Sequence, residues 1–320
     1  MKTALITGIG GQDGSYLAEM LQAQGYHVVG LSRIDGGRLD NIQHLQDRVT
    51  VEQCDLDDQD GLEALLKRHA PAEIYNLAAD SFMPAYAQAP LQATTICALG
   101  AMRLLEAVRK VNPQARFFQA SSSEMFGHAV ERPQSERTPF APHNLYAIAK
   151  VFAHRTTGYY REHYRLFACC GILFNHESPR RNPAFVTRRI TMTAAQIKLG
   201  LVRDLPLGDL ETRRDWGFAG DYTRAMWLML QQPTPDDFVI ATGETHSVRE
   251  FCELAFTHLG LNYEKYVVHD PSRMRSSDYQ PVGNPEKART VLGWKPSVSF
   301  SELVGMMVEA DLKALRDGAP

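Results

Sequence analysis

Three glycines near the start of the chain, Gly8, Gly11 and Gly14, lie between a short apolar run and an amphipathic stretch. The apolar run, Thr3–Thr7, is typical of a buried strand, and residues 15–24 have the periodicity of a helix. Glycines at this spacing let the backbone turn tightly and approach a pyrophosphate, which the N–H groups at a helix start then bind. The chain is therefore predicted to open with a dinucleotide-binding β-α unit.

The rest of the N-terminal half continues the alternation of apolar runs with amphipathic stretches. Further strands are predicted at 26–31, 49–54, 73–77, 116–120, 167–174 and 237–242, and further helices at 62–69 and 100–111. Such alternation is typical of a parallel sheet, because each crossover between parallel strands needs a helix. After about residue 175 the pattern loosens, and 248–320 is expected to form helices and loops. We expect an α/β protein, a Rossmann-type doubly wound parallel sheet with a smaller C-terminal α/β substrate lobe.

The composition argues against several other classes of protein. The chain has 320 residues, 44% hydrophobic and 22% charged, which is ordinary for a soluble globular protein. A net charge of -3 gives no reason to expect nucleic acid or a membrane as partner. No signal peptide and no apolar run of membrane-spanning length is recognised, so a cytoplasmic location is expected. The five cysteines lack Cys-x-x-Cys spacing and the eleven histidines form no metal-spaced cluster, so neither disulfides nor a metal are expected.

The residues that follow the predicted strands favour one cofactor over another. The second strand runs into Arg33 with no acid at its tip. An acid there would bind the ribose 2′-hydroxyl of NAD, whereas an arginine suits the 2′-phosphate of NADP, so Arg33 favours NADP. Asp35 is close enough to keep NAD open. The cofactor contacts expected along this part of the chain are Gly8, Gly11, Gln12, Asp13, Gly14, Arg33, Asp55, Leu56, Leu77, Ala78 and Ala79.

A tyrosine and a lysine four residues apart, Tyr146 and Lys150, indicate the chemistry. Residues i and i+4 share a face of a helix, so the ammonium is expected to favour the phenolate and lower the pKa of Tyr146. Such a tyrosine can exchange a proton with a sugar hydroxyl. Glu124 lies upstream and offers a second acid/base group, which a simple alcohol oxidation does not need.

The glycine pattern, the run Asn76-Leu-Ala-Ala79 and the Tyr-x-x-x-Lys pair together resemble the extended short-chain dehydrogenase/reductase family. Within it, the sequence is similar to the GDP-mannose 4,6-dehydratase family over nearly its whole length. The matching stretches are 4–8, 11–15, 73–79, 123–124, 171–181, 214–217, 225–230, 241–244 and 292–296. The run 173–181 is long and specific to that family.

The resemblance implies a lyase that converts a GDP-sugar to its 4-keto-6-deoxy form by internal hydride transfer through bound NADP. It assigns catalysis to Ser122, Glu124, Tyr146 and Lys150, with Ser122 standing where the family usually has threonine. The implied substrate contacts are Ser81, Ser123, Asn175, Arg181, Arg214 and Arg275, and the further cofactor contacts are Tyr146, Lys150, His176 and Arg181. Residues 1–174, with about 215–246, would then form the NADP-binding domain, and 175–214 with 247–320 the GDP-sugar-binding lobe.

Two segments depart from the family's pattern. The loop 33–39 is short and lacks the Arg-Arg-Ser-Ser run that reaches a neighbouring subunit in relatives, so a homodimer is expected and a homotetramer is left open. The segment 275–281 also differs, which leaves a GDP-heptose or another nucleotide sugar open as substrate. A 4-keto-6-deoxy-sugar reductase or epimerase is a further alternative, although neither needs an acid at position 124. A non-catalytic NADP sensor usually lacks the tyrosine or the lysine.

Overall fold

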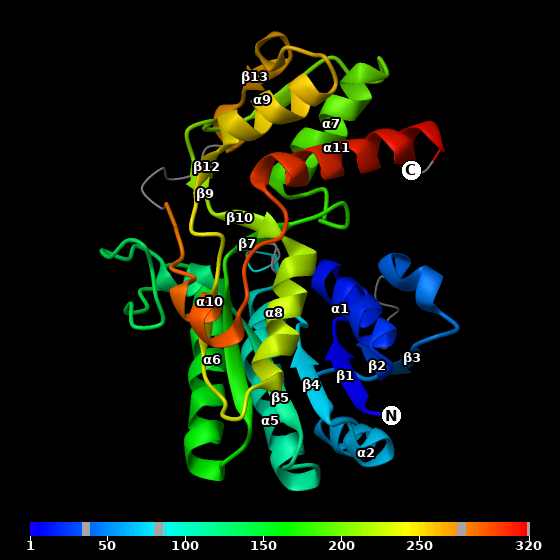
Figure 1. The fold of residues 1–320 in the computed structure, drawn as a ribbon, viewed down its shortest axis with the longest axis vertical. Coiled ribbons are helices and arrows are strands. Elements are labelled where there is room, and N and C mark those ends of the chain that lie inside the picture. The colour runs from blue at the N-terminus through cyan, green and yellow to red at the C-terminus, as the bar shows by residue number, and fades with distance from the viewer. Residues whose placement is uncertain (34–38, 80–85, 87, 274–279, 319–320) are drawn as a thin grey trace.

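The computed structural model describes residues 1–33, 39–79, 86, 88–273 and 280–318. A large lobe is built on a seven-stranded parallel sheet, and a smaller lobe lies beyond one end of it (Figure 1). The strand order is β11-β6-β5-β4-β1-β2-β3. The strands are β1 (Thr3–Thr7), β2 (His27–Ser32), β3 (Thr50–Gln53), β4 (Glu73–Asn76), β5 (Arg116–Ser122), β6 (Ala168–Leu173) and β11 (Phe238–Ile240). The predicted doubly wound parallel sheet is confirmed.

Two layers of helices cover the sheet, and the alternation of side chains along β1 explains both. Ala4 and Ile6 point to one face and Leu5 to the other, because successive side chains of a strand leave on opposite sides. The first face packs against α1 (Gln12–Ala23), α8 (Ala219–Gln231) and α10 (Glu286–Leu292). The second packs against α2 (Gln59–His69), α5 (Gly100–Val111) and α6 (Leu145–Tyr164). The strand order reverses between β1 and β4, and such a switch point opens a crevice at the carboxyl ends of the strands.

The smaller lobe has a hydrophobic core of its own. Its helices α7 (Val186–Lys198), α9 (Val248–His258) and α11 (Phe300–Arg316) contribute Ile190, Phe251 and Met307 to that core. Three short strand pairs join it: β7 (Asn175–Glu177) with β10 (Trp216–Phe218), β9 (Arg213–Arg214) with β12 (His246–Ser247), and β8 (Leu205–Leu207) with β13 (Val267–His269). The remaining short elements are η1 (Asp40–Leu45), α4 (Pro90–Thr94), η2 (Thr95–Leu99), η3 (Ser123–Phe126), η4 (Tyr263–Lys265) and η5 (Pro271–Arg273).

Two features of the helices differ from the sequence-based expectations. Helix α7 lies in the stretch after residue 175, where the sequence pattern did not predict a helix. Its buried face packs against α9 and α11, and this packing stabilises the helix. The continuous helical stretch Pro90–Val111, 22 residues long, is just apolar enough to cross a membrane by length and composition alone. The expectation that no such stretch exists is therefore wrong by that criterion. Half of its most apolar window is buried inside the protein, as in the core helix of a globular protein.

The division into two domains stays a prediction. Trp294, which lies in the part of the chain assigned to the GDP-sugar-binding lobe, is fully buried in the core of the larger lobe.

Candidate active site

A cleft of about 810 Å³ lies at the carboxyl ends of β5 and β6 and extends to the smaller lobe. It brings together residues that are far apart in the sequence. The predicted site residues that line it are Asp13, Leu77, Ala79, Ser122, Ser123, Glu124, Tyr146, Lys150, Asn175, His176, Arg181 and Arg214. Ser81 and Arg275 lie outside the described residues.

Tyr146 and Lys150 lie one turn apart near the start of α6, as the spacing predicts. The Lys150 ammonium nitrogen is 5.7 Å from the centre of the Tyr146 ring and donates a hydrogen bond of 2.7 Å to the carbonyl of Ala120. Both side chains are buried. Burial raises the pKa of Tyr146, and the positive charge of Lys150 offsets only part of this effect. Lys150 therefore acts on the tyrosine pKa in the expected direction, but the net shift is upward because burial is the larger effect.

Glu124 reaches the same cleft from η3, directly after β5. The Ser122 hydroxyl caps this short helix by accepting a hydrogen bond from the Glu124 amide at 3.2 Å. The Asn144 side-chain amide donates to the Glu124 carboxylate at 3.3 Å, and its oxygen accepts from the Ala147 amide at 2.8 Å. Asn144 thus joins the carboxylate to the first turn of the helix that carries Tyr146. Sequence reasoning gave Asn144 no role, although asparagine is a strong N-cap residue.

The glycine-rich turn between β1 and α1 is built as the sequence predicts. Gly8 has a φ of +71°, which L side chains rarely adopt. A Cβ at Gly14 would lie 2.3 Å from the carbonyl oxygen of Gly8 and 2.7 Å from the Cα of Ile9. Only glycine permits this close contact between strand and helix. The Asn41 side chain, which sequence reasoning missed, donates to the carbonyl of Gly10 at 3.0 Å and steadies the turn.

His176 ties the start of α1 to β7. Its Nδ1 contacts the Phe174 carbonyl at 2.7 Å, and its Nε2 contacts the Asp13 carboxylate at 2.8 Å. A protonated ring satisfies both contacts, because each partner accepts a hydrogen. Burial works against that charge, but Asp13 outweighs it and leaves the pKa of His176 raised. The Gln12 side chain adds a hydrogen bond of 3.0 Å to the His176 carbonyl.

A buried polar network places the segment after β4. The Thr7 hydroxyl accepts from the amides of Leu77 and Ala78, each at 3.0 Å, and donates to Asn76 at 2.8 Å. Asn76 in turn donates to Gln119 on β5 at 2.8 Å. These bonds fix the backbone of residues 77–79 beside the cleft, where Leu77, Ala78 and Ala79 are predicted to contact the cofactor.

Arginines from the smaller lobe give a positive charge to the part of the cleft that lies away from the sheet. Arg181 lies 3.0 Å from the Glu177 carboxylate and 3.6 Å from the centre of the Phe185 ring. Arg214 donates to the Arg213 carbonyl at 2.7 Å. Arg189 and Arg273 also line the cleft, which sequence reasoning missed because no short motif marks them. Such groups suit a diphosphate.

The residues predicted for the adenosine end lie along the same edge of the sheet but outside the lining of this cleft. Arg33 directly follows β2, and Asp55 and Leu56 follow β3. The Leu56 side chain is buried in the core, so it can offer only its backbone to a ligand. Asp35 falls outside the described residues.

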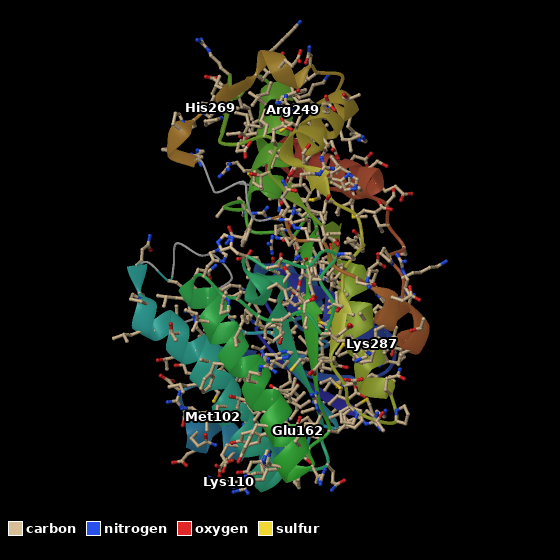
Figure 2. All side chains as sticks on the ribbon, turned by 90° about the vertical axis from the view of Figure 1, so that its left-hand side faces the viewer. Met102, Lys110, Glu162, Arg249, His269 and Lys287 are labelled. Carbon is tan, nitrogen blue, oxygen red and sulfur yellow. The ribbon has the colours of Figure 1, made fainter. Side chains whose placement is uncertain are left out.

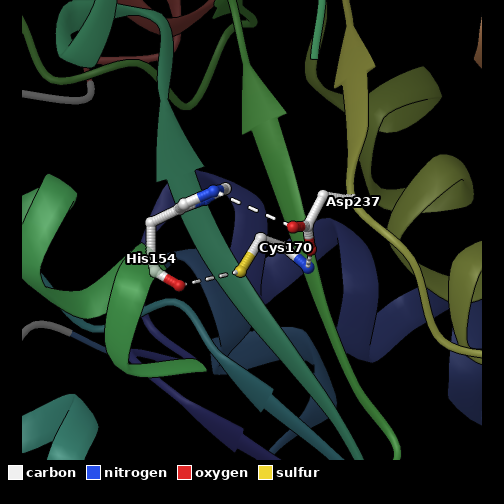
Figure 3. A group of neighbouring side chains, drawn as sticks. All are labelled: His154, Cys170 and Asp237. Atoms are coloured by element: carbon white, nitrogen blue, oxygen red, sulfur yellow. Dashed lines mark hydrogen bonds and ion pairs between the residues drawn. The ribbon is translucent and has the colours of Figure 1, made fainter. Parts of the chain in front are cut away.

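Among the described residues, His154, Cys170 and Asp237 form one group whose ligand atoms lie within 4.8 Å of one another (Figure 3). The Arg161 guanidinium already pairs with both carboxylate oxygens of Asp237, at 2.7 and 2.9 Å. The His154 Nδ1 lies 3.0 Å from the Ser121 hydroxyl. Burial lowers the pKa of His154 to about 4 and raises the pKa of the Cys170 thiol well above its usual value. A neutral thiol and an arginine-paired carboxylate favour a structural cluster over a metal site.

The chain is similar in sequence to known proteins over nearly its whole length. The family model of GDP-mannose 4,6 dehydratase matches residues 5–307. GDP-mannose 4,6 dehydratase 2 of Arabidopsis thaliana is 48% identical over 326 residues, which cover 98% of this chain and 87% of the relative. GDP-mannose 4,6 dehydratase of Homo sapiens is 42% identical over 342 residues, covering 98% and 92%.

Solved structures agree on the fold. UDP-glucose 4-epimerase of Thermotoga maritima, solved with UDP-glucose, superposes with a TM-score of 0.88 at 25% identity, covering 98% of this chain and 99% of the other. A dTDP-glucose 4,6-dehydratase of Bacillus anthracis in complex with NAD superposes with a TM-score of 0.86 at 23% identity, covering 99% and 98%. The resemblance noted from the motifs is thus confirmed, and the chain belongs to the GDP-mannose 4,6-dehydratase family.

Proposed function

We propose that this protein is a GDP-mannose 4,6-dehydratase, a lyase that converts GDP-D-mannose to GDP-4-keto-6-deoxy-D-mannose. The observation that carries the proposal is the meeting of Glu124 with Tyr146 and Lys150 in one cleft, with Asn144 linking the two parts. The tyrosine and lysine serve oxidation at C4, and the carboxylate serves removal of water across C5 and C6. A reductase or epimerase would leave Glu124 without a task.

The cofactor is a nicotinamide dinucleotide, and we assign it as NADP. Residues 8–14 fit a pyrophosphate because glycines stand where the backbone makes its closest contacts and because α1 begins among them, at Gln12. Solved relatives by fold were crystallised with NAD or with NADPH, so the fold accepts both. Arg33 at the end of β2 favours the 2′-phosphate of NADP.

When bound, the cofactor would accept the hydride from C4 and return it to C6, so it is not consumed. Tyr146 takes the proton from the sugar O4 during the oxidation, and Lys150 favours the phenolate that accepts it. Ser122 binds the same oxygen through its hydroxyl. The new 4-ketone acidifies the C5 proton, which Glu124 removes, and Glu124 then protonates the C6 hydroxyl, which leaves as water. Once the hydride is on C6, C5 takes up the proton that Tyr146 received from O4, so both side chains regain their starting protonation states.

Arginine side chains of the smaller lobe bind the diphosphate of the substrate. Arg181 and Arg214, with Arg189 and Arg273, line the part of the cleft that would receive the diphosphate. Asn175 and Ser123 line the cleft as further substrate contacts, and Ser81 and Arg275 remain contacts proposed from the family pattern alone. The choice between mannose and a heptose depends on the segment 275–281, most of which is outside the described residues.

One assay tests the proposed reaction. The purified protein is incubated with a panel of GDP-, UDP- and dTDP-hexoses without added reductant, and products are followed by mass. We expect a dehydrated 4-keto sugar from GDP-mannose. Turnover of another sugar in preference to GDP-mannose would reassign the substrate, and no dehydrated product from any of them would refute the proposal.

We further propose that the protein is a homodimer formed through α5 and α6. These helices lie side by side on the face in Figure 2, where Met102 and Glu162 are labelled. Leu99, Met102, Ile148, Phe152 and Tyr159 from this region are each 40% to 50% exposed. An apolar surface of this kind is typical of an interface between identical copies.

The molar mass of the protein in solution tests the dimer. We expect about twice the chain mass of 35.8 kDa by light scattering, and about a single chain mass for Phe152→Glu. The matched control is Val268→Glu, which places a charge on an exposed apolar site of the smaller lobe. A monomeric wild-type protein would contradict the dimer. If Val268→Glu were also monomeric, the interface could not be assigned to α6.

The expected cytoplasmic location is kept as a proposal. All five cysteines are buried free thiols, which fits a reducing compartment.

A further inference from the structure

The turn 178–185, between β7 and α7, carries Arg181 into the cleft. Within the turn, the Arg181 amide donates to the Ser178 carbonyl at 3.0 Å, and the Phe185 amide donates to the Asn182 carbonyl at 3.0 Å. Two more local bonds run from the Arg180 amide to the Ser178 hydroxyl at 3.0 Å and from the Ala184 amide to the Asn182 side chain at 2.9 Å. All four span three residues or fewer, so they shape the turn but do not place it relative to the helices around it. The contacts that set it come from opposite sides, one from α1 and the other from α7 and α11.

The first side is the start of α1. The Arg180 guanidinium donates to the Ser15 hydroxyl at 3.0 Å, pairs with Glu19 at 2.5 Å and lies 4.1 Å from the centre of the Tyr16 ring. The Ser178 hydroxyl donates to the Gln12 side chain at 2.8 Å. The turn is therefore attached to the helix that begins at the glycine-rich loop.

The second side is a buried ion pair in the smaller lobe. Arg188 on α7 donates through Nε to the carboxylate of Asp311 on α11 at 2.7 Å, and its Nη2 is 2.5 Å from the same carboxylate. Its third nitrogen, Nη1, donates to the backbone carbonyls of Pro179 and Arg181, the latter at 3.1 Å. Asp311 is only 1% exposed, and its second oxygen accepts from the Thr191 hydroxyl at 2.6 Å.

Asp311 acts on the turn only indirectly, through Arg188. Asp311 touches no residue of the turn in these contacts; it holds Arg188, and Arg188 holds the two carbonyls on either side of Arg180. A guanidinium is a rigid planar fork, so fixing two of its nitrogens on a carboxylate fixes where the third can donate. The buried carboxylate thereby sets the path of the backbone at Arg181 from the last helix of the chain.

We propose that Asp311 is a positioning residue for the substrate site, acting through Arg188 to place Arg181. The inference rests on the proposed function for the role of Arg181 in holding the GDP-sugar. Without the carboxylate, a partly buried guanidinium loses its charged partner and turns towards other acceptors, which releases the carbonyls of the turn. Arg181 then samples several positions and binds a diphosphate less well.

The test compares Asp311→Asn with wild type in three measurements. We expect KM for GDP-mannose and Kd for GDP, measured by calorimetry, to rise about 2- to 30-fold, with kcat little changed. Hydrogen exchange of the backbone amides in 178–185 should become faster, because the turn loses its external support. A stable purified variant with unchanged KM, Kd and exchange would overturn the proposal.

A matched control separates positioning from general destabilisation. Asp221 on α8 is also a buried aspartate, and it accepts from Ser297 at 2.6 and 2.8 Å without contacting the turn. Asp221→Asn should leave Kd for GDP and exchange in 178–185 at wild-type values; equal changes in both variants would refute a specific role for Asp311. If Asp311→Asn does not fold, Thr191→Val carries the test, because it removes one hydrogen bond to Asp311 and keeps the ion pair. It should shift Kd in the same direction by a smaller factor, and an unchanged Kd would count against the proposal.

Failure of the proposal for Asp311 can be distinguished from failure of the proposed function. Wild-type turnover of GDP-mannose decides the function, whereas exchange in 178–185 requires no substrate and decides whether Asp311 holds the turn.

Discussion

Replacement of Glu124 by glutamine separates the two halves of the proposed reaction. Glutamine has the same shape, and its side-chain oxygen can still accept the 3.3 Å hydrogen bond from Asn144. The change therefore removes the ability to exchange a proton while the helix start at Asn144 and the nearby Tyr146 keep their places. We expect dehydration to slow about 100- to 10,000-fold, because that is the usual contribution of a positioned acid or base. This factor corresponds to about 3 to 5 kcal/mol of activation free energy.

The assay is a single-turnover reaction of enzyme and cofactor with GDP-mannose, quenched at intervals and analysed by mass. The Glu124→Gln variant should accumulate a 4-keto sugar that still carries its C6 hydroxyl. Tyr146→Phe is the matched comparison, because it should block oxidation and give neither species. Release of the 6-deoxy-4-keto product by Glu124→Gln at near wild-type rate would refute the role of this carboxylate.

Three further predictions concern the cofactor site and the fold. Arg33→Ala should raise Kd for NADP, measured by calorimetry, more than Kd for NAD, since only NADP has a 2′-phosphate; equal changes would remove the basis for assigning NADP. Gly14→Ala should destabilise the protein by about 1–3 kcal/mol in urea unfolding and weaken cofactor binding, because its Cβ would overlap the Gly8 carbonyl. His154 has its pKa lowered to about 4, so below pH 6.5 the unfolded chain binds more protons and stability falls by about 1.4 kcal/mol per pH unit down to about pH 4. The variant His154→Phe should lose this part of the slope, and parallel pH profiles for the two proteins would contradict the cause.

Local features of the sequence determined the main architecture. The run Thr3–Thr7, the glycines that follow it and the alternation after them are short-range patterns, and their physics acts within one β-α unit. The relation of Tyr146 to Lys150 is equally local, since four residues are one turn of a helix. These features were predictable because no distant residue is needed to produce them.

Packing decided the features that the sequence reasoning missed or got wrong. Helix α7 contains several threonines and an apolar face that is recognisable only once α9 and α11 cover it. The pKa of Tyr146 depends on how deeply the fold buries the ring, and that burial outweighs the lysine beside it. Depth in a folded protein cannot be read from spacing along the chain.

The sequence by itself determined the glycine-rich β-α unit, the tyrosine–lysine pair and the glutamate upstream of that pair. Together these features were enough to recognise the family. Tertiary structure alone decided that Asn144 joins Glu124 to the start of α6, and that Asp311 reaches the turn at Arg181 through Arg188. The physical reason is that a hydrogen bond or ion pair depends on distances of about 3 Å between atoms. Residues separated by 123 positions, as Arg188 and Asp311 are, reach such distances only when the whole fold is in place.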